Sequence, residues 1–152
     1  MRLVVLSAAA ALVAVTPAVA NEIRAEARGG AIWEEGNTEA VAGVALGYDF
    51  DLGETAFVGA DVSADKVLAG GNKVAFAVTG RGGAKIGAGK LFVEGGYTSE
   101  FFDEGDGMWV AGAGYQHSFG EKLYGKVAYR HYFVKNSNID RDAVFAGVGV
   151  KF

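Results

Sequence analysis

Apolar and polar residues alternate along most of the chain after residue 20. Between Ala40 and Phe50, for example, the even positions carry Ala, Val, Leu, Tyr and Phe, while the odd positions carry Val, Gly, Ala and Asp. Successive side chains of a β-strand point to opposite faces, so this period of two predicts strands rather than helices. It recurs in about eight segments of roughly 9–11 residues, the length of a tilted membrane strand. The segments cover residues 23–33, 40–50, 56–65, 74–86, 91–100, 109–119, 123–130 and 144–152.

Charged residues fall on only one face of these segments, which also carries glycines such as Gly43 and Gly47. A soluble, lipocalin-like barrel would turn its charged face to water and its apolar face inward. We favour the opposite arrangement, because acids and bases balance on the charged face and glycine makes room in a lumen that side chains fill. The apolar face then contacts lipid, where each Arg or Lys would cost roughly 2–4 kcal/mol. The predicted fold class is all-β, an eight-stranded antiparallel up-and-down transmembrane β-barrel.

The inward charges are predicted to neutralise one another in an ion-pair network that fills the lumen. The alternative is a narrow pore, in which the inward Arg and Lys residues line a path for small solutes or ions. The residues expected in the network are Arg24, Glu26, Arg28, Asp61, Arg81, Lys85, Glu94, Lys126 and Arg130.

Aromatic residues on the apolar face gather near the predicted strand ends. This placement is typical of the two aromatic girdles at the membrane–water interfaces. The expected interfacial aromatics are Trp33, Tyr48, Phe50, Trp109, Phe119 and Phe152.

Residues 1–20 have the pattern of a cleaved export signal. Arg2 supplies a positive charge, an apolar run follows, and Ala18-Val19-Ala20 ends the segment in the small-x-small pattern of signal peptidase sites. Residues 21–152 are therefore expected to form one barrel domain, with both termini in the periplasm. The outer loops are expected near residues 34–38, 66–73, 101–107 and 134–142.

The last strand carries a family resemblance. Residues 144–152 alternate apolar side chains and end in an aromatic residue, as do the final strands of Gram-negative outer-membrane proteins. The turn at 51–54 is similar to the periplasmic turns of OmpA/OmpX-like barrels and opacity-type, porin-family surface proteins. The resemblance implies that Val148, Val150 and Phe152 are a signal for the barrel-assembly machinery. It also implies contact with outer-membrane lipids and lipopolysaccharide, and a role in envelope integrity, adhesion or another surface interaction.

Composition narrows the remaining possibilities. The chain has no cysteine and a net charge of −4, so it offers no thiolate metal site and no electrostatic reason to bind nucleic acid. We expect no cofactor. His131 and Ser137 invite comparison with outer-membrane lipid A deacylases, but they are six residues apart, whereas those enzymes keep them two apart on one strand. A lipid A-modifying hydrolase is therefore an alternative, and the prediction is that the protein is not an enzyme.

Overall fold

The computed structural model describes residues 21–99, 107–135 and 140–152. The expected export signal, most of the loop at 101–107 and Ser137 lie outside the described residues. No helix among the described residues is long and apolar enough to cross a membrane. The strands are β1 (Asn21–Glu34), β2 (Asn37–Leu52), β3 (Ala56–Val67), β4 (Val74–Ile86), β5 (Gly89–Thr98), β6 (Met108–Phe119), β7 (Leu123–Phe133) and β8 (Arg141–Lys151).

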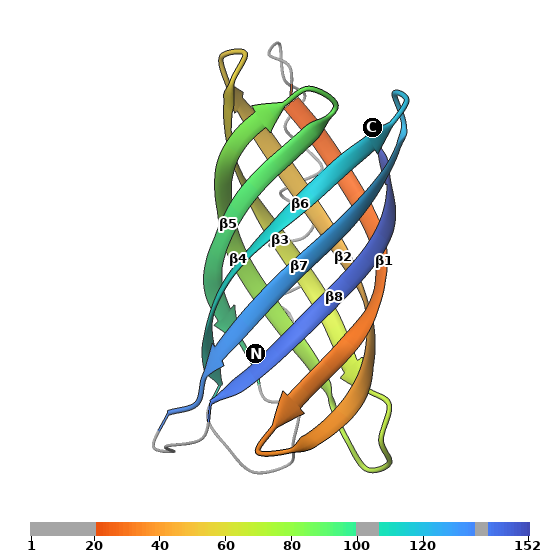
Figure 1. Cartoon of the computed structure of the whole chain (residues 1–152), viewed down its shortest axis with the longest axis vertical. Coiled ribbons are helices and arrows are strands. Elements are labelled where there is room, and N and C mark those ends of the chain that lie inside the picture. Colours follow the sequence, from red (N-terminus) through yellow and green to blue (C-terminus); the bar gives the residue numbers. More distant parts are fainter. Residues whose placement is uncertain (1–20, 100–106, 136–139) are drawn as a thin grey trace, which may run out of the picture.

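The strands form a closed antiparallel barrel in which each strand pairs with its neighbours in the sequence (Figure 1). The seam lies between β1 and β8, where Ala25 is opposite Val150. Beyond the last strand residue, the Phe152 amide donates to the Ile23 carbonyl at 2.9 Å and the Ile23 amide donates back at 3.3 Å. The predicted eight-stranded antiparallel barrel is confirmed.

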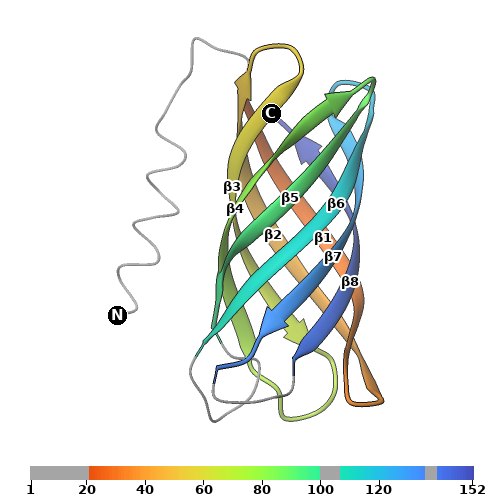
Figure 2. The same cartoon turned by 60° about the vertical axis from the view of Figure 1, so that its left-hand side comes forward.

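The two ends of the barrel differ in their connections (Figure 2). Asn21 and Phe152 lie at one end, which we call the terminal end, together with the turns at residues 53–55, 87–88 and 120–122. The opposite end, which we call the loop end, carries the turn at 35–36 and the longer connection at 68–73.

The hairpin of β1 and β2 extends further than the sequence pattern predicts. Its connection is the two-residue turn Glu35–Gly36, with φ of 43° and 89°, instead of a loop over 34–38. Positive φ at both central residues is the signature of a tight hairpin turn whose twist matches that of the strands. The strands can therefore stay paired up to Glu34 and Asn37.

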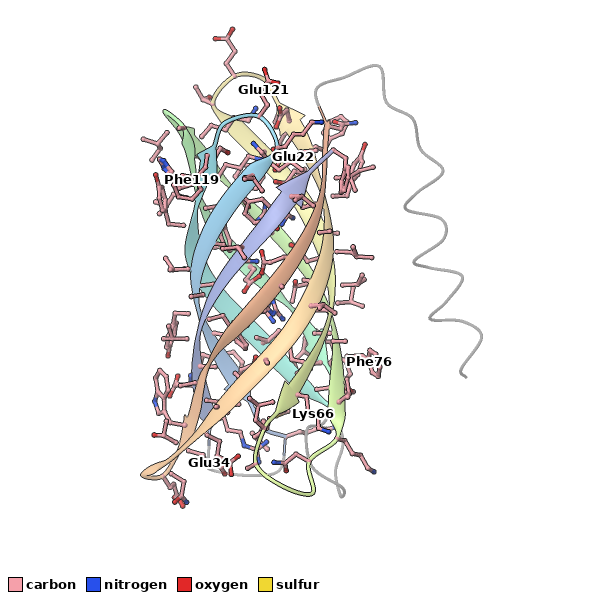
Figure 3. All side chains as sticks on the ribbon, turned by 90° about the vertical axis from the view of Figure 1, so that its right-hand side faces the viewer. Glu22, Glu34, Lys66, Phe76, Phe119 and Glu121 are labelled. Atoms are coloured by element: carbon pink, nitrogen blue, oxygen red, sulfur yellow. The ribbon has the colours of Figure 1, made fainter. Side chains whose placement is uncertain are left out.

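The two faces of the sheet differ sharply in chemistry (Figure 3). Outward side chains are apolar and exposed, with 70% of Val148, 65% of Val93 and 62% of Val78 accessible. Inward side chains include charged residues such as Arg24, which is 1% exposed. The charged face therefore encloses the lumen, the reverse of a lipocalin-like barrel, and the large exposed apolar face is typical of a surface that meets lipid.

Candidate functional site

A carboxylate in the terminal half of the lumen is surrounded by cations. Asp49 on β2 is fully buried. Its Oδ1 accepts hydrogen bonds from Arg24 Nη2 at 3.1 Å and from Arg81 Nε at 2.9 Å, and its Oδ2 accepts one from Lys90 Nζ at 2.8 Å. Arg24 Nη2 also donates to Asp61 Oδ1 at 2.9 Å. Charges this deeply buried are tolerable because each has a partner of opposite sign.

Two further groups of ion pairs join other strands inside the lumen. Arg130 donates to both oxygens of Glu94, from Nε at 2.6 Å and from Nη2 at 3.1 Å, in the two-pronged geometry that favours arginine. Glu26 Oε2 lies 2.8 Å from Lys126 Nζ and accepts a hydrogen bond from the Tyr124 hydroxyl at 3.0 Å. These contacts connect β1, β5 and β7 across the lumen.

Arg28 completes the network towards the loop end. Its Nε donates to Asp65 Oδ1 at 2.8 Å, and its guanidinium lies 4.8 Å from the centre of the Phe145 ring. Arg81 is similarly placed, 5.2 Å from the Phe57 ring and 4.9 Å from the Phe92 ring. Cation–π contacts of this kind stabilise a desolvated guanidinium in addition to its ion pairs.

Glycines make room for these long side chains. Gly59 faces inward and is directly opposite Arg81, and a methyl group built on it would overlap Asp49 Oδ1 and approach Tyr48 O to 2.6 Å. Gly47 lies opposite Arg24, and a methyl group there would overlap the Arg24 guanidinium. An L side chain at either site would occupy space that the ion pairs already fill.

The structure differs from the sequence prediction at Lys85 and Lys90. Lys85 does not reach the buried network, because it pairs with Asp51 near the terminal end, where its side chain is 25% exposed. Lys90, which the sequence prediction left out, contacts Asp49 instead. The two lysines are opposite each other on β4 and β5, so like-charge repulsion favours a different carboxylate for each.

The lumen is closed towards the loop end by an apolar cluster that the sequence analysis did not anticipate. Val67, Met108 and Ala143 are fully buried in it. Because the cluster lies between the ion pairs and the loop end, the described lumen has a charged part and an apolar cap. The residues of this cap are Ile32, Val41, Val67, Ala75, Met108, Val110, Tyr132, Ala143 and Phe145.

All six aromatic residues expected at the interfaces belong to the outward register. Trp33 and Trp109 lie towards the loop end, and 64% of Trp109 is exposed. Tyr97 was not singled out from the sequence, yet its ring packs edge-on against Trp109 with the ring centres 5.4 Å apart. The other expected aromatics lie towards the terminal end: Tyr48, Phe50, Phe119 and Phe152.

Two charges occupy the outward face at the loop end, beyond the segments that the alternation predicts. Because β8 begins at Arg141 and not at residue 144, Asp142 falls in the outward register. It lies opposite His131, whose Nδ1 is 2.7 Å from Asp142 Oδ1, and the Tyr129 hydroxyl donates to the same oxygen. Lys66 is also outward, because β3 continues to Val67. Both charges lie near strand ends, where the cost of a charge in a membrane falls towards zero.

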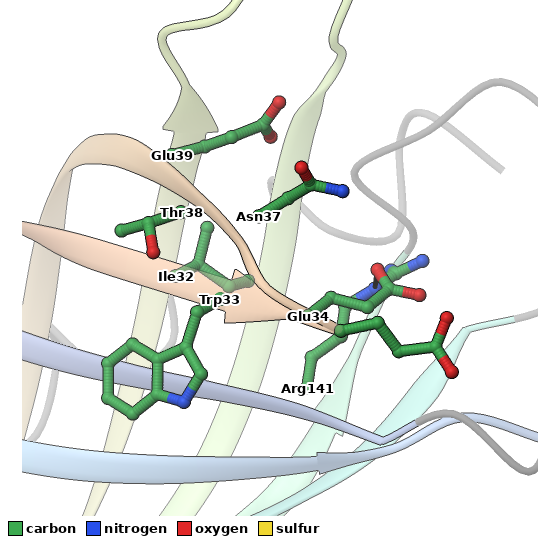
Figure 4. A pocket seen from close by; sticks show the side chains of 8 residues that line it. Ile32, Trp33, Glu34, Asn37, Thr38, Glu39 and Arg141 are labelled. Atoms are coloured by element: carbon green, nitrogen blue, oxygen red, sulfur yellow. Dashed lines mark hydrogen bonds and ion pairs between the residues drawn. The ribbon is translucent and has the colours of Figure 1, made fainter.

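A pocket of about 320 Å³ lies at the tip of the β1–β2 hairpin (Figure 4). Arg141 on β8 pairs there with Glu34 on β1. Within the described part of the chain, no group of three or more His, Cys, Asp and Glu side chains is placed to hold a metal ion. The lining residues are Ile32, Trp33, Glu34, Glu35, Asn37, Thr38, Glu39 and Arg141.

No family model and no curated protein matches the sequence. Solved structures do match the fold. The N-terminal β-barrel domain of Pseudomonas aeruginosa OprF superposes with a TM-score of 0.63 at 14% identity, covering 86% of this chain and 97% of that domain. Ail, the attachment invasion locus protein of Yersinia pestis, superposes with a TM-score of 0.61 at 14% identity, covering 88% of this chain and 99% of Ail. This chain has the fold of the small outer-membrane β-barrels.

The same barrel fold also occurs in an enzyme. The outer-membrane enzyme PagL superposes with a TM-score of 0.53 at 16% identity, covering 82% of this chain and 97% of PagL. Because one fold supports several functions, the function of this barrel has to be argued from its own side chains.

Proposed function

We propose that this barrel is a non-conducting, structural or surface-interaction protein of a Gram-negative outer membrane, with a role in envelope integrity or adhesion. The observation that carries the proposal is the filled lumen. Asp49, Arg24 and Arg81 are at most 4% exposed, and the apolar cap covers them towards the loop end. A lumen built this way has no continuous hydrated path, so the barrel serves as a rigid support for its loops.

The proposed orientation places the loop end outside the cell and the terminal end in the periplasm. Residues 1–20 would direct export and be removed before β1 inserts. Val148, Val150 and Phe152 would act during biogenesis as the signal for the barrel-assembly machinery. Val148 and Val150 lie in the outward register of β8 and Phe152 directly follows the strand, 77% exposed, so their side chains are accessible to such a partner.

Lipids and lipopolysaccharide of the outer leaflet are the proposed partners at the loop end. Phe76 and Trp109, which are 57% and 64% exposed, suit the interfacial level of the membrane. Lys66 is exposed on the outward register of β3, opposite Val74 of β4, where a cation can meet lipid phosphates. A further surface ligand would bind the loops, and no chemistry of the described loop residues identifies it.

Planar-bilayer recording of the purified, folded protein tests the proposal against the narrow pore. We expect no stable unitary conductance. Folding has to be verified in the same preparation by the change in gel mobility on boiling, because an unfolded sample would also be silent. Reproducible unitary steps from the folded barrel would contradict the sealed lumen and establish the pore.

A rim hydrolase is the second candidate, because His131 is held by Asp142 as a general base would be. Among the described residues, the hydrogen-bonding and ionic partners of His131 are carboxylates, and no hydroxyl or thiol nucleophile contacts it. Mass spectrometry of lipid A from cells that overproduce the protein or its His131→Ala variant tests this candidate. We expect the same acylation in both strains, and loss of an acyl chain only with the unmodified protein would establish the enzyme.

A further inference from the structure

The outward surface near the terminal end contains an apolar groove of about 390 Å³. This volume lies within the usual range of roughly 300–1,000 Å³ for small-molecule sites. The groove crosses β7 and β8 and reaches β1, so it lies beside the seam of the barrel. The lining residues are Ala25, Phe119, Leu123, Tyr124, Val148, Gly149 and Val150.

Small residues create the depression between larger side chains. Gly149 faces inward, and a methyl group on it would approach the Tyr124 hydroxyl oxygen to 2.5 Å, so the floor is backbone lying over a tyrosine. The Phe119 ring leans over Gly125, 3.0 Å from the position of an added methyl group. Ala25 leaves the β1 side open next to Val150.

An exposed lysine lies in the turn that joins two of the strands carrying the groove. Lys122 lies in the turn between Phe119 and Leu123, which both line the groove, and its side chain is exposed. Its carbonyl oxygen accepts a hydrogen bond from the Lys151 amide at 2.7 Å, which fixes the backbone of the turn. Lys151 Nζ is itself engaged, at 2.9 Å from Ser118 Oγ and 3.6 Å from Glu22 Oε2. Among the described residues, no side chain forms an ion pair with Lys122.

We propose that this groove holds one glycerophospholipid of the leaflet at the terminal end, with an acyl chain along the groove and the phosphate on Lys122. The occupant has to be apolar along its length and anionic at the end that reaches the turn. A phospholipid meets both requirements, and the transmembrane fold turns the groove towards its hydrocarbon chains. The lysine supplies a charge-assisted contact of the kind that phosphate favours. The inference goes beyond the proposed surface role and does not depend on it.

Native mass spectrometry of the full barrel, released from detergent after titration with dioleoyl phosphatidylethanolamine, tests the proposal. Ala25→Phe fills the groove from β1, and Ala27→Phe is its matched control, since Ala27 is outward and exposed on the same strand but does not line the groove. Lys122→Gln removes the cation, and Lys135→Gln is the control at the loop end, where Lys135 is also exposed.

The unmodified barrel should retain one phospholipid with saturable affinity. Loss of a charge-assisted contact in Lys122→Gln should weaken retention about tenfold. Ala25→Phe should abolish it, and both controls should bind as the unmodified protein does. Equal retention by Lys122→Gln and Lys135→Gln would overturn the phosphate assignment even if Ala25→Phe failed to fold. Retention of detergent only, with no saturable phospholipid, would overturn the site.

Discussion

Gly59 and Gly80 allow a direct test of the tightly filled lumen, because they lie almost side by side on paired strands and face opposite sides of the sheet. A methyl group on Gly59 would lie 2.6 Å from Tyr48 O, about 0.8 Å closer than an ordinary contact, and would overlap Asp49 Oδ1. A methyl group on Gly80 would face lipid, with its nearest neighbour at 3.9 Å. Neither glycine has a positive φ, so alanine strains neither backbone conformation.

In Gly59→Ala, Asp49 has to move, and its hydrogen bonds from Arg24 and Arg81, now 3.1 and 2.9 Å long, have to stretch or break. A lost hydrogen bond to a charged group costs about 1.5–3 kcal/mol, and overpacking adds about 1–3 kcal/mol. We therefore expect a loss of about 3 kcal/mol in the free energy of unfolding. Gly80→Ala should be neutral or should stabilise by up to about 1 kcal/mol, because alanine restricts the unfolded chain.

The assay is a urea titration of each purified variant in detergent micelles, with the folded fraction read from the unheated gel band. Since the slope for a small protein is about 1–3 kcal/mol per M urea, the midpoint of Gly59→Ala should fall by roughly 1–3 M. If the two alanine variants unfolded within about 0.5 kcal/mol of each other, the space around Asp49 would be looser than we infer, and the argument from close packing would fail.

Three further outcomes are expected. Arg81→Ala should destabilise the folded barrel by about 3–5 kcal/mol in the same titration, because it leaves Asp49 short of a buried partner, and an unchanged midpoint would refute the network. Lys85→Met should cost at most about 1 kcal/mol, since its ion pair is partly exposed, and a loss as large as that of Arg81→Ala would place Lys85 in the network after all. Phe145→Ala should lower the free energy of unfolding by about 3–5 kcal/mol, because it opens a cavity in the apolar cap. Bilayer recording of this variant then shows whether the cap alone blocks ions.

The fold could be predicted from the sequence because period-two alternation also determines which face each residue occupies. The alternation correctly places the charged face inward. It does not predict the apolar cap, which is formed by apolar inward residues such as Val41, Val110 and Phe145. Alternation cannot distinguish the two faces where both are apolar. Lys90 falls between the predicted segments 74–86 and 91–100, whereas β5 already begins at Gly89.

The partners within the network were beyond sequence reasoning for a different reason. Arg24 contacts Asp49 and Asp61 on two other strands, and these choices depend on the stagger of the strands around the barrel and on the reach of a long side chain. The outward position of Asp142 was missed because β8 begins before its regular alternation does.

The seam between β1 and β8 has a consequence for the order of folding. Glu26 on β1 meets Lys126 and Tyr124 on β7, about one hundred positions later in the chain, and the hydrogen bond with Tyr124 spans 98 residues. An open, curled sheet would leave these groups apart, so their mutual neutralisation comes only with the last pairing step. Barrel closure is therefore expected to be cooperative and slow relative to hairpin formation, because the contacts that stabilise the closed barrel join the most distant parts of the sequence.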